Sequence, residues 1–214
     1  VIHRHGRVFS SEGHLAPSVF GDSSSLNLSP GDVVVMSGGA TGISAHLARC
    51  LAPFTPRLVF LGRTPLEPGT NFDHRASEIA RTLADLHSSG IEATYHTCDV
   101  TDPEAVRAIM GEVASRYGKI DGIIHGAGVL RDGPLSQMTT DDFSMVTDVK
   151  FLGAWNLFSA AEGAGLRFFV GLSSGAAIQG NPGQANYAAA NRMMSALLRT
   201  LHRKNGAIRF KALM

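Results

Sequence analysis

The chain has 214 residues, which is enough for one domain with a substantial buried core. A formal net charge of +1 gives no broad electrostatic basis for binding nucleic acid or an anionic membrane surface. No apolar run approaches the roughly 20 residues that span a bilayer. Cys50 and Cys98 form no CxxC pair, and the nine histidines follow no metal-ligand spacing. We therefore expect a reduced, cytoplasmic protein without a metal site, a nucleic-acid partner or a membrane partner.

Residues 1–32 are rich in Ser, Gly and Pro, and this composition predicts an irregular linker or arm. Beyond it, apolar runs bounded by turn residues alternate with segments at helical spacing, with a loop expected over 64–74. We expect strands over 33–36, 57–62, 92–98, 122–128, 168–174 and 208–214. We expect helices over about 42–52 and 75–89, from about 103, and over 139–163 and 184–204.

Strands that alternate with helices predict a parallel sheet that is covered on both faces. Right-handed crossovers then give an α/β fold of the Rossmann-like, doubly wound type, with the strand order 3-2-1-4-5-6. Ligands of such sheets bind beyond the carboxyl ends of the strands, where the strand order reverses. This rule selects the loops after residues 36, 62, 98, 124 and 172 as the place of a functional site.

Glycines dominate the loop between the first strand and its helix. Small residues let the backbone approach a pyrophosphate, and a helix N-terminus offers free N–H groups and the positive end of a dipole. Glycines also occur in turns for structural reasons alone, and the spacing is Gly-xxx-Gly-x-small rather than GxGxxG, with Ser44 in the third position. The predicted cofactor contacts in this loop are Ser37, Gly38, Gly39, Thr41, Gly42 and Ile43.

The loop after the second strand discriminates between cofactors. An acidic residue at its start would accept hydrogen bonds from an adenosine ribose, but Gly62 and Arg63 stand there instead. A guanidinium favours a 2′-phosphate through charge-assisted hydrogen bonds. We therefore predict NADPH over NADH, and the alternative is that Arg63 is a solvated surface residue.

The loops after the third and fourth strands complete the predicted cofactor site. Asp99, followed by Val100, could accept a hydrogen bond from the adenine amino group. Asp99 could instead cap the next helix, although Asp102 is better placed for that role. Small residues after the fourth strand leave room for a flat ring and a ribose, and they are Gly126, Ala127 and Gly128.

Four residues supply the parts needed to move a proton to a carbonyl oxygen: Lys150, Ser174, Tyr187 and Asn191. Tyr187 is the predicted proton donor, but an unperturbed phenol has a pKa of about 10 and is a weak acid near neutrality. A nearby cation such as Lys150 lowers that pKa by about 1–3 units, and Lys150 can also hold the nicotinamide ribose hydroxyls. With the cofactor loops, this set indicates the reduction of a ketone.

The two neutral members of the set have supporting roles. Ser174 can donate a hydrogen bond to the substrate oxygen, and Ser173 is the less favoured alternative. Asn191 lies four residues after Tyr187, on the same helix face, and could order a water that returns a proton to the phenol. Taken singly, each residue has a simpler explanation in packing, capping or surface charge, so the prediction depends on their combination.

The motifs SGGATGIS, CDV and HGAG, with the Ser174 and Tyr187 pair, resemble the short-chain dehydrogenase/reductase superfamily. In its ordinary members a Lys follows the Tyr by four residues and an Asn lies on the preceding helix, whereas here Asn191 and Lys150 are exchanged. That exchange resembles the ketoreductase domains of polyketide synthases and polyunsaturated fatty-acid synthases. The segments LGRTPL, HGAGVLRDGPL and GNPGQANYAAAN are similar to the same domains, and the resemblance runs over residues 33–214.

The resemblance implies the NADPH-dependent reduction of a 3-ketoacyl thioester that is bound to an acyl carrier protein, within a synthase whose other domains are partners. It also implies that residues 33–214 are the NADPH-binding catalytic domain, incomplete at its C-terminal end before the family's last strand. Residues 1–32 would then be a linker or arm from an upstream structural subdomain. The alternatives are a free-standing short-chain reductase of a small ketone and an inactive nucleotide-binding structural domain.

The resemblance also extends to stereochemistry. Residues 130–132 read Leu-Arg-Asp, which keeps the last acid of the Leu-Asp-Asp found in ketoreductases that yield the D-3-hydroxy configuration. Pro182 and Asn186 are similar to that class, and Gln179 stands where the opposite class has Trp. The resemblance therefore favours a D-3-hydroxyacyl product.

Overall fold

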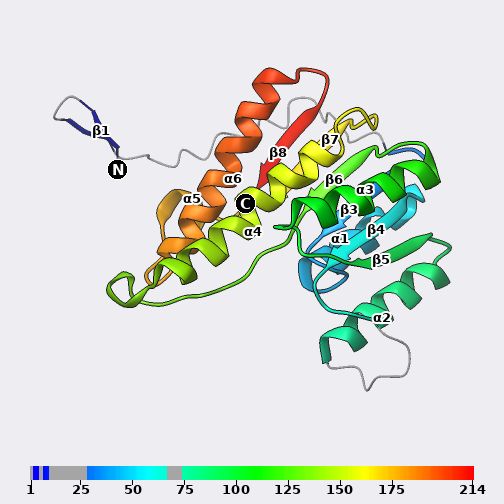
Figure 1. Cartoon of the computed structure of the whole chain (residues 1–214), viewed down its shortest axis with the longest axis horizontal. Coiled ribbons are helices and arrows are strands. Elements are labelled where there is room, and N and C mark those ends of the chain that lie inside the picture. Colours follow the sequence, from blue (N-terminus) through cyan, green and yellow to red (C-terminus); the bar gives the residue numbers. More distant parts are fainter. Residues whose placement is uncertain (1, 5–6, 10–27, 67–73) are drawn as a thin grey trace.

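The computed structural model describes residues 2–4, 7–9, 28–66 and 74–214, and its centre is a six-stranded parallel sheet (Figure 1). The strands lie in the order β5-β4-β3-β6-β7-β8. Counted along the chain, this is 3-2-1-4-5-6, so the predicted doubly wound topology is confirmed. Their bounds are β3 Val33–Ser37, β4 Arg57–Gly62, β5 Ala93–Thr97, β6 Gly122–His125, β7 Phe168–Leu172 and β8 Arg209–Leu213.

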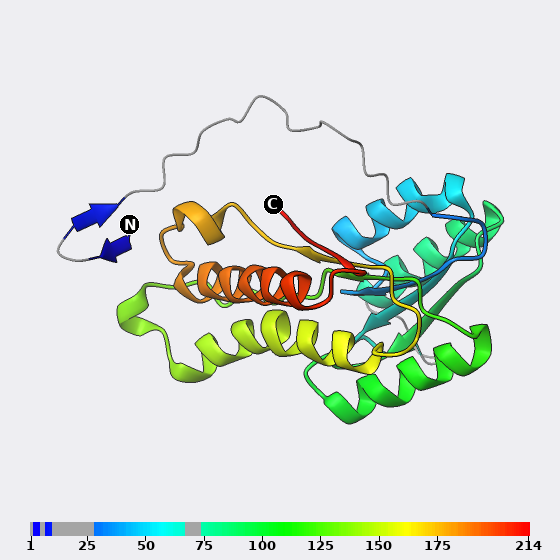
Figure 2. The same cartoon turned by 90° about the horizontal axis from the view of Figure 1, so that it is seen from above.

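Helices cover both faces of the sheet, with α1 and α2 on one face and α3, α4 and α6 on the other (Figure 2). The predicted helices all exist, with ends within a few residues of the expected ones. Their bounds are α1 Gly42–Leu51, α2 His74–Ser88, α3 Pro103–Tyr117, α4 Thr140–Ala160 and α6 Ala185–Lys204. Asp102 caps α3 by accepting from the N–H groups of Glu104 and Ala105, as predicted.

The central strands are mainly apolar because each face of the sheet has its own core. In β3, Val33 and Val35 pack with residues of α3, α4 and α6. Val34 and Met36 point the other way and pack with residues of α1 and α2. A strand that is buried on both faces shows a continuous apolar run instead of an alternating pattern, which is why VVVM was recognisable in the sequence.

Some short elements of the fold differ from the sequence-based expectation. The irregular arm predicted over residues 1–32 was wrong for β1 Ile2–Arg4 and β2 Arg7–Phe9, which pair as an antiparallel hairpin. Residues 10–27 of that arm, and 67–73 of the loop expected over 64–74, lie outside the described residues. The short helix α5 Ala176–Gln179 and the 3₁₀ turn Leu135–Gln137 were not predicted, because each is too short for a periodic signal.

A charge cluster joins the amino ends of the central strands. Asp32 and Asp121 are buried just before β3 and β6. Lys119 Nζ lies 2.9 Å from an oxygen of each, and Arg167 donates to both carboxylates. Burial acts to raise the pKa of Asp32, but hydrogen bonds from the Ser29 N–H, Lys119 and Arg167 outweigh it and lower this pKa. These contacts keep Asp32 ionised and hold the starts of the strands together.

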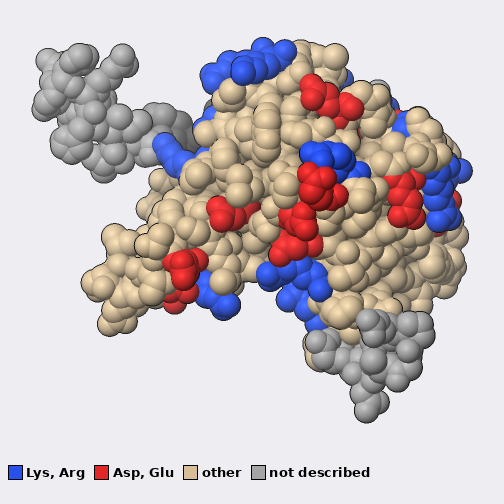
Figure 3. Space-filling model, in the orientation of Figure 1, with Lys and Arg blue, Asp and Glu red and all other residues tan. Residues whose placement is uncertain are grey.

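The surface is mixed in charge: on the face shown in Figure 3, Lys and Arg lie among Asp and Glu side chains. Within the described ranges, no helix is both long and apolar enough to cross a membrane.

Candidate active site

A cavity of about 810 Å³ lies at the carboxyl edge of the sheet, where the strand order reverses. The loops after β3, β4, β5 and β6 all contribute to its lining. Figure 3 shows a notch on this side of the molecule with basic side chains on both of its borders. The predicted cofactor residues that line the cavity are Gly38, Gly39, Thr41, Arg63, Asp99, Val100, Gly126, Ala127 and Gly128.

The glycine loop is pressed against the loop after β6. Gly38, Gly39 and Gly42 have φ values of 103°, 69° and 53°, a region that side-chain-bearing residues rarely adopt. A Cβ on Gly38 would lie 2.7 Å from the carbonyl carbon of Gly126. The N–H groups of Gly38 and Gly39 both donate to the Leu61 carbonyl. A side chain at position 38 would collide with the Gly126 backbone, and the small residues leave the backbone of this cradle open to the close approach of a dinucleotide's phosphates.

Three predicted contacts of the same loop do not line the cavity. Ser37 is fully buried, and its Oγ lies 2.6 Å from Nδ1 of His125, so it joins β3 to β6. Burial, helped by the charge of Lys150, lowers the pKa of His125 to about 3, so this imidazole is neutral. Gly42 begins α1, and the Ile43 side chain is exposed. Ser37 therefore positions the loops, whereas Ile43 can offer a backbone N–H group; the Gly42 N–H donates to Glu78 of α2 at 3.0 Å.

Ser44 stands where this kind of loop often has a third glycine. The absence of a side chain at Gly126 makes room for the Ser44 hydroxyl. Its side chain is buried, and its Oγ would lie 2.7 Å from a Cβ on Gly126. The hydroxyl occupies space that Gly126 leaves open. Ser44 is therefore compatible with the close packing of the two loops, provided that position 126 stays glycine.

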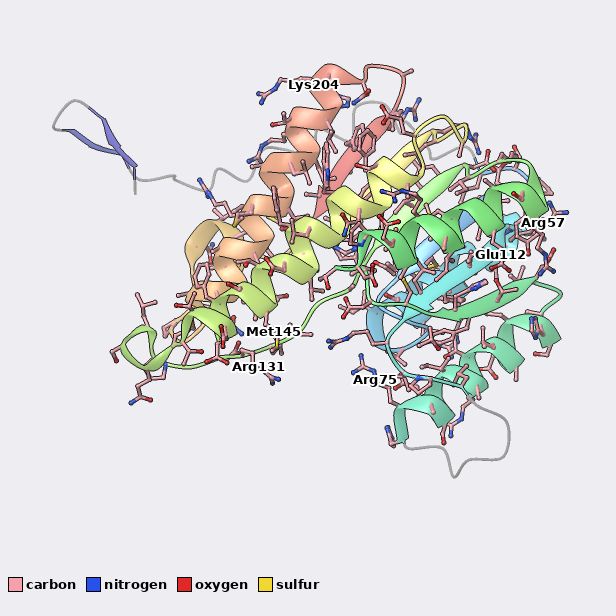
Figure 4. All side chains as sticks on the ribbon, in the orientation of Figure 1. Arg57, Arg75, Glu112, Arg131, Met145 and Lys204 are labelled. Carbon is pink, nitrogen blue, oxygen red and sulfur yellow. The ribbon has the colours of Figure 1, made fainter. Side chains whose placement is uncertain are left out.

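The end of β4 explains the missing acidic residue. A Cβ on Gly62 would lie 2.6 Å from the Tyr95 hydroxyl, which donates to the Thr64 carbonyl at 2.8 Å. The tyrosine thus fills the space that a side chain at position 62 would need. Arg63 lines the cavity beside it, and so does Arg75 from the start of α2 (Figure 4). Neither arginine has an ion-pair partner among the described residues.

Sequence reasoning missed Arg75. The residue lies twelve positions after Arg63 along the chain, at the end of a proline- and glycine-containing loop, and no local pattern marks it. Only the packing of α2 beside the end of β4 brings it to the same cavity. The available signal in the sequence was the set of basic residues that follow the carboxyl ends of the predicted strands.

Asp99 has a structural role that is already visible. Its Oδ1 accepts from the N–H and the hydroxyl of Thr101, at 2.9 and 2.8 Å, which forms the turn before α3. Asp99 and the buried Val100 both line the cavity. The turn uses one carboxylate oxygen, and the adenine contact predicted for Asp99 remains a prediction.

Lys150 is buried in the middle of α4, directly behind the cavity wall. Its Nζ donates to the Leu172 carbonyl at 2.7 Å, and a Cβ on Gly128 would lie 3.3 Å from its Cε. No carboxylate pairs with it among the described residues. Burial lowers the pKa of Lys150 to about 8. This amine is therefore a cation that lacks a structural counter-ion.

Ser174 and Ser173 follow β7 and differ in their contacts. The Ser173 hydroxyl lies 3.0 Å from that of Ser195 on α6, and its N–H donates to the Leu213 carbonyl. Among the described residues, the Ser174 hydroxyl accepts only from the N–H of Ala176, at 3.2 Å, and its own proton has no acceptor there. This difference favours Ser174 over Ser173 as a donor to a substrate.

Tyr187 and Asn191 lie on the first two turns of α6, which packs beside α4 (Figure 1). Asn191 is fully buried and its Nδ2 donates to the Tyr187 carbonyl at 2.8 Å, while its Oδ1 has no partner among the described residues. The Tyr187 hydroxyl likewise forms no hydrogen bond within the described ranges. The four predicted catalytic residues come from the end of β7, from α4 and from α6, and none of them lines the cavity itself.

Asn186 braces the backbone of Tyr187. It is fully buried, its Oδ1 accepts from the Tyr187 N–H at 2.7 Å, and its Nδ2 donates to the Arg131 carbonyl at 2.8 Å. Gln184 adds a bond to Asp132, and the Gly133 N–H donates to the Gly183 carbonyl. Residues 131–133 and 183–186 therefore form one wall next to the tyrosine.

Arg131 lies where this wall meets the main cavity. It lines both that cavity and a second one of about 210 Å³, which is bounded by residues 131–134 and by the start of α4. Figure 4 shows Arg131 and Met145 on one side and Arg75 on the other. The main cavity therefore carries arginines on two opposite borders.

Comparisons with known proteins agree with this arrangement. The family model described as the KR domain matches residues 32–209. A phenolphthiocerol synthesis polyketide synthase of type I from Mycobacterium marinum is 35% identical over 192 residues, which cover 89% of this chain. The match spans 9% of the length of that synthase.

Solved structures give the same result for the fold. The crystal structure of an N-terminal ketoreductase from a macrolactin assembly line has a TM-score of 0.75 and 30% identity, and the match covers 83% of this chain and 35% of that one. A short-chain dehydrogenase from Burkholderia cenocepacia in complex with NADP has a TM-score of 0.73 and 24% identity, with 86% and 72% covered. At that identity, the second likeness concerns the fold alone.

Proposed function

The chain belongs to the KR domain family, and from this premise we propose that it reduces a 3-ketoacyl thioester with NADPH, with Tyr187 as the proton donor. The observation that carries the proposal is the buried Lys150, which lies behind Gly128 of the cavity lining and has no carboxylate partner in the part of the chain that the structure describes. Holding a charge in such a place is costly, so a structural role alone is a poor explanation for it. A cation that assists a developing phenolate is a better one.

The proton transfer is assigned to side chains of this chain. The nicotinamide cofactor, when bound, supplies the hydride to the carbonyl carbon. The Tyr187 hydroxyl gives its proton to the carbonyl oxygen, and the Lys150 ammonium stabilises the phenolate that remains. The Ser174 hydroxyl donates to the same substrate oxygen and keeps it within reach of the phenol.

The route for returning a proton to Tyr187 is assigned to Asn191. Its unpartnered Oδ1 is a buried acceptor, and a buried acceptor without a partner costs about 1–3 kcal/mol. A water that donates to this oxygen would remove that cost. The same water could pass a proton toward the phenol.

The preference for NADPH is supported by the two arginines at the end of β4. Arg63 and Arg75 line the cavity without ion-pair partners among the described residues, and position 62 has no room for the acid that would select NADH. A 2′-phosphate would give the two guanidinium groups a common anion. The glycine cradle and the small residues 126–128 would hold the diphosphate and the nicotinamide ribose.

The substrate carrier and the stereochemistry follow from the family. Because the matching relative is a synthase about ten times longer than the matched region, we propose that the substrate arrives on an acyl carrier protein and that other synthase domains are partners. The wall formed by residues 131–133 and 183–186 fixes one side of the approach to Tyr187. Because Asp132 and Asn186, which are similar to the D class, belong to this wall, we propose the D-3-hydroxy product.

The first experiment measures NADPH consumption with a simple 3-ketoacyl thioester and identifies the hydroxyacyl product by chiral analysis. For the cofactor assignment, Arg63→Ala and Arg75→Ala should each raise the Kd for NADPH by about 10–100-fold. They should change the Kd for NADH by less than about threefold, because NADH has no 2′-phosphate. Arg81→Ala, an exposed arginine of α2 that does not line the cavity, is the matched control. Equal effects on both dinucleotides would reject the NADPH assignment.

A further inference from the structure

The helix that faces the predicted diphosphate site, α1, has no cap of its own. Thr41 is its N-cap residue, but the threonine side chain makes no capping hydrogen bond. The first turn of α1 contains no acidic residue. Helix N-termini normally need such groups, because their first N–H groups have no partner within the helix.

A carboxylate from another helix takes the place of the cap. Glu78 of α2 accepts a hydrogen bond from the Gly42 N–H, with 3.0 Å between nitrogen and Oε1. The two residues are 36 positions apart in the chain. The Ala45 N–H donates to the Thr41 carbonyl, and no acceptor for the Ile43 and Ser44 N–H groups is seen among the described residues. One N–H of the first turn is therefore occupied by Glu78, and two are left for a ligand.

We propose that Glu78 is a positioning residue for the cofactor loop. Three glycines with positive φ make residues 38–42 intrinsically free in conformation, so ordering them costs more entropy than ordering other residues would. The Gly38 and Gly39 N–H groups are fixed by the Leu61 carbonyl, and Glu78 fixes the other end of the loop at Gly42. The loop is thereby ordered before the dinucleotide binds. The N–H groups of Ile43 and Ser44 then remain available to the dinucleotide's diphosphate.

The same helix supplies a charge of the opposite sign. Arg75 lies one turn before Glu78 and lines the cavity. Glu78 places a negative charge at the N-terminus of α1, near the predicted diphosphate position. The positive charge of Arg75, which lies on α2 like Glu78, limits the repulsion between Glu78 and a phosphate. Helix α2 therefore contributes at two places of the proposed dinucleotide site, through Glu78 at the diphosphate loop and through Arg75 at the adenosine side.

The proposal rests on the assignment of this cavity to a nicotinamide dinucleotide, and two variants of Glu78 test it. Glu78→Ala removes the acceptor, and we expect the Kd for both NADPH and NADH to rise by about tenfold, because the loop is common to both. Glu78→Gln keeps an acceptor oxygen without the charge, and we expect its Kd values to stay within about threefold of the original protein. Lower Kd values in both variants would identify Glu78 as a competitor of the phosphate and would overturn the proposal.

A matched control comes from the same pair of helices. Asp85 of α2 pairs with Arg49 of α1 at 3.1 Å, and both side chains are exposed. Asp85→Ala removes this second tie between α1 and α2 and should leave both Kd values unchanged. A rise equal to that in Glu78→Ala would mean that general helix packing, and not the cap at Gly42, controls the affinity.

A readout without cofactor separates this proposal from the proposed function. Amide hydrogen exchange over residues 38–44 should become about tenfold faster in Glu78→Ala and should change little in Glu78→Gln and Asp85→Ala. Unchanged exchange in Glu78→Ala would overturn the positioning role, whatever the affinities. If the original protein binds neither NADPH nor NADH, the proposed function fails, and the exchange measurement still decides the role of Glu78.

Discussion

The two edges of the central sheet differ in whether their buried charged and polar groups have partners. At the amino edge, Asp32 and Asp121 are both paired with Lys119 and Arg167, and Asp121 also accepts the Val33 N–H at 2.8 Å. At the carboxyl edge, the buried Lys150 has a carbonyl as its only partner among the described residues, and Asn191 Oδ1 has none. Complete pairing indicates a structural role, whereas unpaired buried groups indicate a ligand or a reaction.

The largest effect on turnover should come from a substitution at the carboxyl edge. Tyr187→Phe removes one hydroxyl, which has no hydrogen bond in the described structure, so the fold should not suffer. We expect the turnover of a 3-ketoacyl thioester to fall by about 10²–10⁴-fold, because the proton donor is lost. The Kd for NADPH, measured by titration, should remain nearly the same. Near-normal turnover in this variant would reject Tyr187 as the proton donor.

At the amino edge, we expect a substitution to lower the stability of the fold and to leave the turnover unchanged. Asp121→Ala leaves Lys119 and Arg167 with one carboxylate fewer and leaves the Val33 N–H without its acceptor. We expect the free energy of unfolding to drop by about 3 kcal/mol, measured by denaturant titration. The turnover of the folded fraction should be retained. In the exposed Arg49 and Asp85 pair, Asp85→Ala should cost less than about 1 kcal/mol.

The pH dependence of the reduction tests the role of the unpaired Lys150 cation. Burial lowers the pKa of Lys150 to about 8, so the amine is charged below pH 8 and becomes neutral above it. Since the reduction needs the cation, its rate at saturating NADPH and substrate should fall as the pH rises through about 8, by about tenfold per further unit. His125 is neutral over this range, because its pKa is about 3. A rate that stays level between pH 7 and 9 would argue against Lys150.

The sequence was sufficient for the architecture because the central strands are buried on both faces. Runs such as VVVM and LVFL are apolar throughout, and their alternation with helical segments predicts a doubly wound parallel sheet. The glycine loop and Arg63 were also readable, since each follows directly on a strand end. These are local signals, and Gly38, Gly39, Thr41 and Arg63 line one cavity.

Residues that act across the fold could not be predicted in the same way. Arg75 and Glu78 lie in a helix whose sequence looks like an ordinary amphipathic surface helix, and only the packing of α2 brings them to the cavity and to Gly42. The buried brace of Asn186 depends on the carbonyl of Arg131, which is 55 positions away. Such contacts are tertiary, so no spacing rule within one element reveals them.

Lys150→Met tests the central claim most directly, because it asks whether a buried group serves chemistry or stability. The lowered pKa means that carrying the charge at pH 7 costs the folded state about 3 kcal/mol. The claim therefore predicts that the variant unfolds with an equal or higher free energy, while its turnover with saturating NADPH falls by about 100-fold or more. A variant that loses several kcal/mol of stability and keeps its turnover would contradict it.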